Sequence, residues 1–214
     1  TRECLTNMDG NIKSNEQMNY YSLIQKVNDS GGTAFAYSPE EFSISQELIP
    51  MIERKNELPF VLTLTKVEEV KDGLKMSDNL AGLEPWLDYL PNNLVWSFMS
   101  DKFRRIIEMN LTGREGISWI KAIVRGRNDE REYNILRFEK KLDVLDLQRT
   151  VFAKGTDHIV MPRFSPLKVN SFTLFHMPGL FWQITSDLYV NDTLRKAILR
   201  DKITGVEFEK ISLE

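Results

Sequence analysis

The chain has 214 residues and a formal net charge of −3, with 42% hydrophobic and 28% charged residues. This balance is typical of a soluble globular protein with a sizeable core, and no stretch approaches the roughly 20 apolar residues that span a bilayer. The single cysteine, Cys4, excludes an intrachain disulfide and a zinc site built from cysteines.

The first 17 residues are polar, and they lack both hydrophobic periodicity and the apolar core of a secretory signal. We interpret residues 1–17 as a disordered segment, or as one that precedes the true start of the protein. The cysteine usage fits a reducing compartment, so we expect a cytoplasmic protein.

Residues 18–93 predict an N-terminal α+β part. The runs "YYSLIQKV" (20–27) and "FVLTLTKVEEV" (60–70) are rich in β-branched and aromatic residues, which favour strands. The turn signal "NDSGG" (28–32) follows the first of them.

Two further segments complete this part. The stretch "SISQELIPMIERKN" (43–56) predicts a short helix that Pro50 limits. Residues 74–93 hold two prolines around an apolar stretch, which predicts an irregular connection and a boundary after residue 93.

Residues 94–214 begin with a predicted short strand, 94–99, followed by a helix. Ser100 is a good N-cap, and Asp101 suits the positive end of a helix. The apolar residues of this helix fall at helical spacing on one face, and glycines stop it; they are Phe103, Ile106 and Ile107, then Gly113 and Gly116. The runs 117–126 and 131–139 then predict a β-hairpin.

The C-terminal stretch repeats this order. Strands are predicted at 157–164 and 167–177, and "LFWQITSD" (180–187) parallels "LVWSFMSD" (94–101). The helix start at Asn191 matches the one at Ser100 in residue type, after an extra "LYVN". Both helices then reach a Thr-Gly pair and resume as strands.

The sequence therefore predicts an α+β fold: a twisted, mostly antiparallel sheet with a few short helices and two similar strand–helix–strand units. An internal duplication and two independent occurrences of a common capped helix both explain the repeat.

No catalytic or metal-binding pattern is present in the sequence. His158 and His176 lie in apolar runs without a partner at metal spacing, and we expect neither an enzyme nor a cofactor. The basic and aromatic residues of 125–141 could form a platform for single-stranded nucleic acid. Acids are threaded through them, so a hairpin of mixed charge is the better interpretation.

Charge and tryptophans give the candidates for partner binding. Residues 40–100 carry eleven acids and five bases, a net charge of −6, whereas residues 101–168 carry a net charge of +5. Trp96 and Trp182 occupy matching places in the two units, which indicates core packing. Trp86 lies between two prolines, so we expect it to be exposed as an interaction anchor.

The C-terminal stretch, Ser165 to Ile211, resembles the end of bacterial immunity proteins of polymorphic toxin systems, in the groups called immunity protein 43 and immunity protein 11. An apolar strand, a Ser-Asp helix start, a helix with an apolar inner face and a Gly-apolar-x-Phe strand carry the resemblance; they fall on Trp182–Ile184, Ser186-Asp187, Leu194–Leu199 and Gly205–Phe208. The extra "LYVN" departs from the usual spacing.

The resemblance implies a cytoplasmic protein that binds and neutralises a cognate toxin, and it carries over no catalytic residue. If the toxin is a nuclease with a basic cleft, the acidic segment is the expected blocking face. The candidate partner-binding residues are Glu68, Glu69, Asp72, Asp78, Glu84, Trp86 and Asp88. We expect no membrane or nucleic-acid partner, and a homo-oligomer stays open. The alternative is a ligand-binding or scaffold domain of the same fold without a toxin.

Overall fold

The computed structural model describes residues 18–26, 32–52 and 55–213, so that residues 1–17, Cys4 and nearly all of the predicted turn at 28–32 lie outside the described residues. The described strands are β1 (Tyr20–Gln25), β2 (Thr33–Tyr37), β3 (Glu57–Val70), β4 (Gly73–Ser77), β5 (Tyr89–Leu90), β6 (Phe98–Met99), β7 (Ile117–Arg125), β8 (Glu130–Phe138), β9 (Val151–Phe152), β10 (Ile159–Met161), β11 (Leu174–His176), β12 (Leu188–Asn191) and β13 (Val206–Ile211). The described helices are α1 (Ser45–Ile52), α2 (Asp101–Asn110), α3 (Pro166–Val169) and α4 (Asp192–Arg200), with a 3₁₀ turn η1 (Glu40–Phe42). The fold is α+β, as predicted.

The larger sheet has the strand order β2-β3-β7-β8-β6-β5, and β4 pairs with β3. β3 and β7 run parallel, and the other neighbours run antiparallel. The predicted hairpin is confirmed as β7 and β8, paired from Ile117 opposite Phe138 to Arg125 opposite Glu130. This hairpin lies in the interior of the sheet, because β3 flanks β7 and β6 flanks β8.

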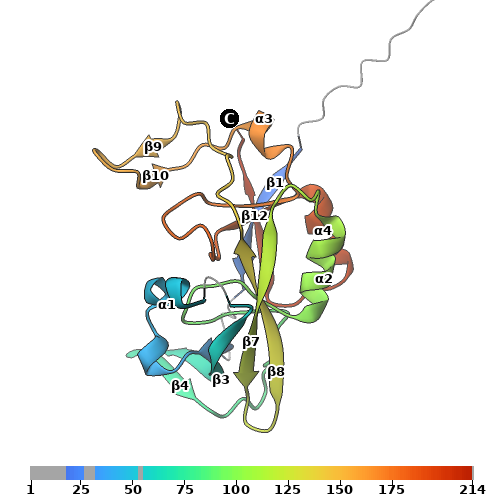
Figure 1. Ribbon diagram of the computed structural model, residues 1–214. Helices are drawn as coiled ribbons and strands as arrows, with labels where there is room; N and C mark the ends of the chain where they lie inside the picture. The colour runs from blue at the N-terminus through green and yellow to red at the C-terminus, as the bar shows by residue number, and fades with distance from the viewer. Residues whose placement is uncertain (1–17, 27–31, 53–54, 214) are drawn as a thin grey trace, which may run out of the picture.

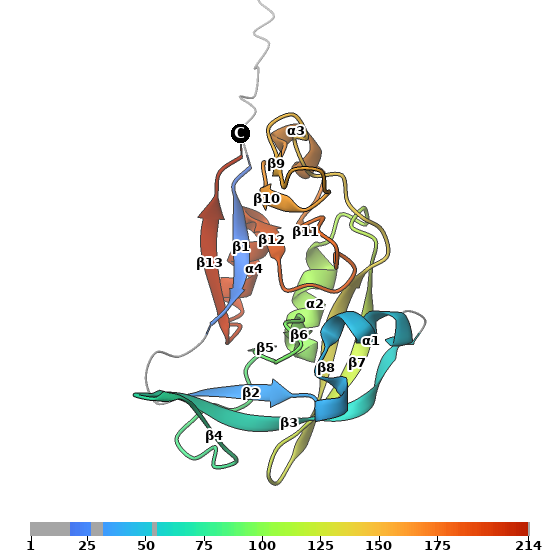
Figure 2. The ribbon, with the colours of Figure 1, turned by 90° about the vertical axis from the view of Figure 1, so that its left-hand side faces the viewer.

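The smaller sheet has the order β11-β12-β1-β13, all antiparallel (Figure 2). β1 belongs to the beginning of the chain, yet it lies between two strands from its end. In the larger sheet, β5 and β6 pair across position 93. The segments before and after the boundary predicted at residue 93 therefore contribute to both sheets. A separate two-stranded arm, β9 and β10, projects from the body (Figure 1).

The two matched helices are α2 and α4, which lie side by side (Figure 1). Their predicted caps are confirmed. Ser100 Oγ accepts a hydrogen bond from the N–H of Phe103 at 3.2 Å, and Asn191 Oδ1 accepts one from the N–H of Leu194 at 2.9 Å. Each cap thus satisfies one of the free N–H groups of a helix start.

The strands before these helices differ from the prediction. β6 covers only Phe98–Met99, because Val95 has a positive φ of 57° that breaks the extended run. Residues 180–187 form no strand. The strand before α4 is instead Leu188–Asn191. This is the "LYVN" that the second unit has in addition to the residues of the first. Pairing with β1 and β11 makes it a strand.

Three other local predictions need correction. α1 continues past Pro50 to Ile52, since buried Leu48 and Ile52 hold it against the sheet. The predicted strand at 167–177 divides into α3, which has Pro166 at its first turn, and β11. The irregular connection at 74–93 contains β4 and β5.

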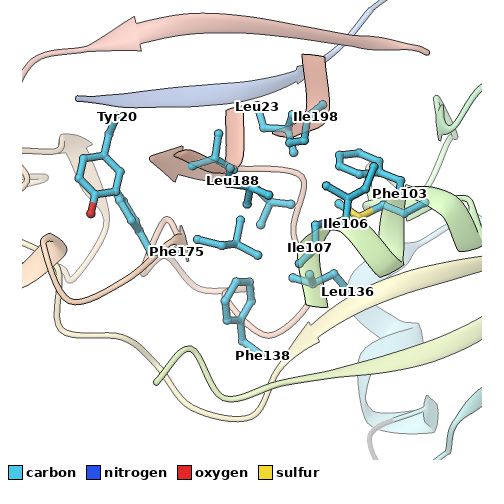
Figure 3. Close-up of a cluster of buried hydrophobic side chains, with 14 of the residues drawn as sticks. Tyr20, Leu23, Phe103, Ile106, Ile107, Leu136, Phe138, Phe175, Leu188 and Ile198 are labelled. Carbon is cyan, nitrogen blue, oxygen red and sulfur yellow. The ribbon is translucent and has the colours of Figure 1, made fainter. Parts of the chain in front are cut away.

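The described residues form two buried apolar clusters. The first lies between the smaller sheet, α2, α4 and the end of β8 (Figure 3). The second lies on the other face of the larger sheet, under α1. Side chains drawn for the first cluster come from both ends of the chain; they include Tyr20, Leu23, Phe103, Ile106, Ile107, Leu136, Phe138, Phe175, Leu188 and Ile198.

Candidate partner-binding site

The hairpin of β3 and β4 is two-faced. Residues directly opposite each other in an antiparallel pair share a face. Glu68 lies opposite Lys75, and Lys66 lies opposite Ser77, whereas Glu69 lies opposite Leu74 and Val67 lies opposite Met76. One face is therefore charged, and the other carries two large apolar side chains.

The charged face is internally neutralised. Lys66 Nζ hydrogen-bonds the Glu68 carboxylate and lowers its pKa, and Lys75 across the strand acts in the same direction. Gly32 is buried against this face: a Cβ at Gly32 would lie 2.6 Å from Glu68 Cγ. Glu68, a predicted partner-binding acid, is thus engaged within the hairpin.

The other face is open. Leu74 is 72% exposed and Met76 is 53% exposed. Among the described residues, β4 pairs only with β3, which leaves its outer edge unpaired. Glu69 and Asp72 lie exposed beside these side chains. Large exposed apolar side chains on an open strand edge are a recognised setting for partner binding and strand addition.

The loop that follows β4 forms a pocket of about 490 Å³ with the β7–β8 turn. Asp78, Trp86, Arg127 and Asp129 are among its lining residues. The pocket and the open hairpin face are continuous along the chain, since Asp78 follows β4 directly. The β3–β4 hairpin and the β7–β8 turn lie at the end of the molecule away from the smaller sheet (Figures 1 and 2).

Trp86 is half-buried at this pocket, which is less exposure than the sequence suggests. Its ring stacks on Tyr133, with centroids 6.4 Å apart, and the Arg131 guanidinium lies 4.8 Å from the Trp86 ring centroid. A Cβ at Gly126 would lie 3.0 Å from the Trp86 ring. These contacts hold the indole in a fixed position at the wall of the pocket.

The Asp88 carboxylate is held by hydrogen bonds within the protein. Its carboxylate accepts hydrogen bonds from Ser100 Oγ at 2.6 Å and from the Thr204 N–H and hydroxyl at 3.0 and 3.1 Å. It thus joins the start of α2 to the loop after α4. A carboxylate with these donors offers little to a partner.

The structure thus divides the seven predicted residues. Four exposed acids, Glu69, Asp72, Asp78 and Glu84, gather at one end with Trp86, whereas Glu68 and Asp88 are held by internal contacts. Leu74 and Met76 were not among the residues predicted from the sequence. Their signal was the alternation in "GLKMS" after the turn "KDG", which is the pattern of a hairpin strand.

His176 and the charged residues of β7 and β8 have partners within the protein. His176 is buried; its Nε2 accepts a hydrogen bond from the Leu142 N–H, and its Nδ1–H donates to the Met177 carbonyl. Cross-strand ion pairs join Lys121 to Glu132 and Arg125 to Glu130. The bases of β7 and β8 therefore have acidic neighbours on the same surface. Within the described residues, no group of three His, Cys, Asp or Glu side chains could hold a metal ion.

Compared with known proteins, the chain matches no family model and no curated protein sequence. In the described part of the chain, none of the helices has the length and apolar character needed to cross a membrane.

Proposed function

We propose that this protein is a non-catalytic, cytoplasmic immunity protein that binds and neutralises a cognate bacterial toxin. The toxin would dock on the open face of the β3–β4 hairpin and on the adjoining Trp86 pocket. Acids that surround this surface suit a toxin with a cationic face, such as a nuclease whose cleft binds phosphates.

One observation carries the proposal: Leu74 and Met76 lie exposed on β4, whose outer edge no other described strand pairs, beside Glu69 and Asp72. Burial of both apolar side chains by a partner supplies affinity, and the acids supply orientation and a fast approach. The half-buried Trp86 adds a rigid aromatic edge of the kind found at binding hot spots.

The resemblance to immunity proteins supports the same proposal from a different part of the chain. Its motifs fall on the segment 182–187, on α4 and on the start of β13, and both α4 and β13 pack against β1. In the proposal these elements are the scaffold, and the recognition surface is built by the N-terminal part of the chain.

The experiment is co-purification of the tagged protein from native cells, followed by mass spectrometry. We expect one larger protein with a C-terminal toxin domain, in near-equal amount, encoded directly upstream. Recovery of no such protein from cells that express the neighbouring genes would overturn the proposal.

Variants then test the surface against the co-purified partner. The double variant Leu74→Ser and Met76→Ser should weaken binding at least about tenfold, as expected for hot-spot side chains. Leu199→Ser is the matched control, since Leu199 is 49% exposed on α4 and lies outside the surface. Equal affinity of the double variant and the control would place the toxin elsewhere.

The charge component has its own pair of variants. Glu69→Lys with Asp72→Lys should lower the association rate and its salt dependence. Glu40→Lys with Glu41→Lys, which reverses two other exposed acids of the same charge, should leave both unchanged. Faster association of the first variant would show that the toxin face is not cationic. Glu68 stays unchanged, because a lysine there would face Lys66 and Lys75.

A further inference from the structure

A second pocket, of about 310 Å³, lies between α1, the turn at 94–96 and the segment 177–187. Both of the matched runs, "LVW" at 94–96 and "LFW" at 180–182, contribute to its walls. The polar side chains of its lining come from α1 and from the end of the segment; they are Ser45, Gln46, Thr185 and Ser186. The volume is at the lower end of the range of small-molecule sites, so it suits a small ligand.

Apolar side chains stand open at the mouth of this pocket. Leu180 is 76% exposed, Phe181 is 45% exposed and Val95 is 63% exposed. The deeper wall is fixed: Trp96 is buried in the second cluster, and Trp182 stacks on the ring of His176 with centroids 5.5 Å apart. The pocket therefore combines a rigid aromatic floor with an apolar rim.

Val95 is held at the rim against its backbone preference. Its φ of 57° is rare for a β-branched residue. The Asn92 side chain enforces this turn, because its Oδ1 accepts from the Trp96 N–H at 3.1 Å and its Nδ2 donates to the Trp96 carbonyl at 2.8 Å. Local strain of this kind tends to occur where a surface is shaped for binding.

Among the described residues that line the pocket, Asp187 is the single charged one. Its carboxylate has no basic partner among the residues that the structure describes. Asp187 is exposed at the pocket, and the protein atoms beside its carboxyl partly desolvate it and raise its pKa. A carboxylate in this position favours a ligand that brings a positive charge.

We propose that this pocket binds a small organic cation: a primary amine attached by a short linker to an apolar body the size of one aromatic ring. The aromatic and aliphatic walls take the body, and Asp187 takes the ammonium group. The site is separate from the β3–β4 face, so the inference stands or falls independently of toxin binding.

Three probes that share one body test the charge requirement. They are phenethylamine, 2-phenylethanol and 3-phenylpropionate, each titrated into the full chain labelled with ¹⁵N. We expect saturable shifts of the Trp96 and Trp182 indole N–H signals with phenethylamine, at an affinity about tenfold or more above that of the alcohol and the acid. Absence of saturable shifts, or binding of the acid as tight as that of the amine, would overturn the proposal.

Asp187→Asn should reduce phenethylamine affinity to the level of the alcohol. The carboxylate of Asp187 accepts no hydrogen bond from the described residues, so this variant should fold. Asp157→Asn is the control, since Asp157 is an exposed acid that lines a different pocket. Unchanged affinity in Asp187→Asn, or an equal loss in both variants, would overturn the assignment of the ammonium to Asp187.

Discussion

The threonine of each Thr-Gly pair donates two hydrogen bonds to one carboxylate. The N–H and hydroxyl of Thr112 reach Glu115 Oε1 at 3.1 and 3.0 Å, and those of Thr204 reach Asp88 Oδ2 at 3.0 and 3.1 Å. Glu115 is fully buried and also accepts from the Thr173 N–H at 2.9 Å. The repeated Thr-Gly thus has the same chemistry in both units. The sequence shows the threonines, but it cannot show that their acids lie close by in one unit and far along the chain in the other.

Removal of the Asp88 carboxylate should destabilise the protein. Asp88→Ala leaves donors of Ser100 and Thr204 without an acceptor in a largely enclosed place, and we expect a loss of about 3 kcal/mol in the free energy of unfolding. Urea denaturation measures it. Asp78→Ala, an exposed acid of the same loop, should change the free energy by less than about 0.5 kcal/mol. Similar values for the two variants would mean that the Asp88 contacts contribute little.

His176 should make stability depend on pH. Burial lowers the pKa of His176 below its ordinary value near 6.5. Between the two pKa values the unfolded chain binds more protons, so the stabilisation by neutral His176 is full above about pH 6.5 and falls as the pH drops. The wild type should therefore lose more stability than His176→Gln between about pH 7.5 and 5, by urea denaturation. His158→Gln, at an exposed position, is the control and should keep the wild-type pH dependence. If both variants changed the pH dependence of stability equally, burial of His176 would not be its cause.

Elements with local signals could be predicted from the sequence, and elements that depend on distant partners could not. The caps at Ser100 and Asn191 and the spacing of Phe103, Ile106 and Ile107 predict α2 and α4. β12 has no such signal, because its four residues are held between β1 and β11 and show no alternation of exposure. β4 is exposed along nearly its whole length and exists as a strand through its pairing with β3.

The loops after α2 and α4 differ in whether they can accept a side chain in place of their glycine. Gly113 and Gly205 both have positive φ, but a Cβ at Gly113 meets open space, whereas one at Gly205 would press on the Tyr89 carbonyl and lie 3.0 Å from Leu87 Cβ. Gly113→Ala should cost about 1 kcal/mol of stability from backbone strain alone. Gly205→Ala should cost about 2 kcal/mol more, because of the added clash. Thermal or urea unfolding checks both, and equal losses would contradict the close approach of Gly205 to the segment 87–89.

At the scale of the whole molecule, a strand from the beginning of the chain pairs with strands from its end. β1 lies between β12 and β13, and the Tyr20 hydroxyl donates to the carbonyls of Val169 and Phe172 at 2.7 and 2.8 Å. The boundary predicted after residue 93 rests on an irregular stretch, 74–93, with two prolines. Prolines indicate only how the chain runs locally. Whether β1 pairs with β12 and β13 depends on how their side chains fit together in the assembled core. The same limit applies to the candidate site: charge counts found Glu69, Asp72, Asp78 and Glu84, but only the hairpin geometry placed Leu74 and Met76 beside them.

The measurement that tests the central claim most directly is hydrogen–deuterium exchange of the protein, free and bound to the toxin that co-purifies with it. If the toxin covers the open hairpin face, the amides of Gly73–Ser77 and of residues 78–86 should become the most strongly protected, because the outer edge of β4 pairs with no other described strand. Protection confined to other surfaces, such as the β9–β10 arm, with residues 73–86 unchanged, would contradict the account.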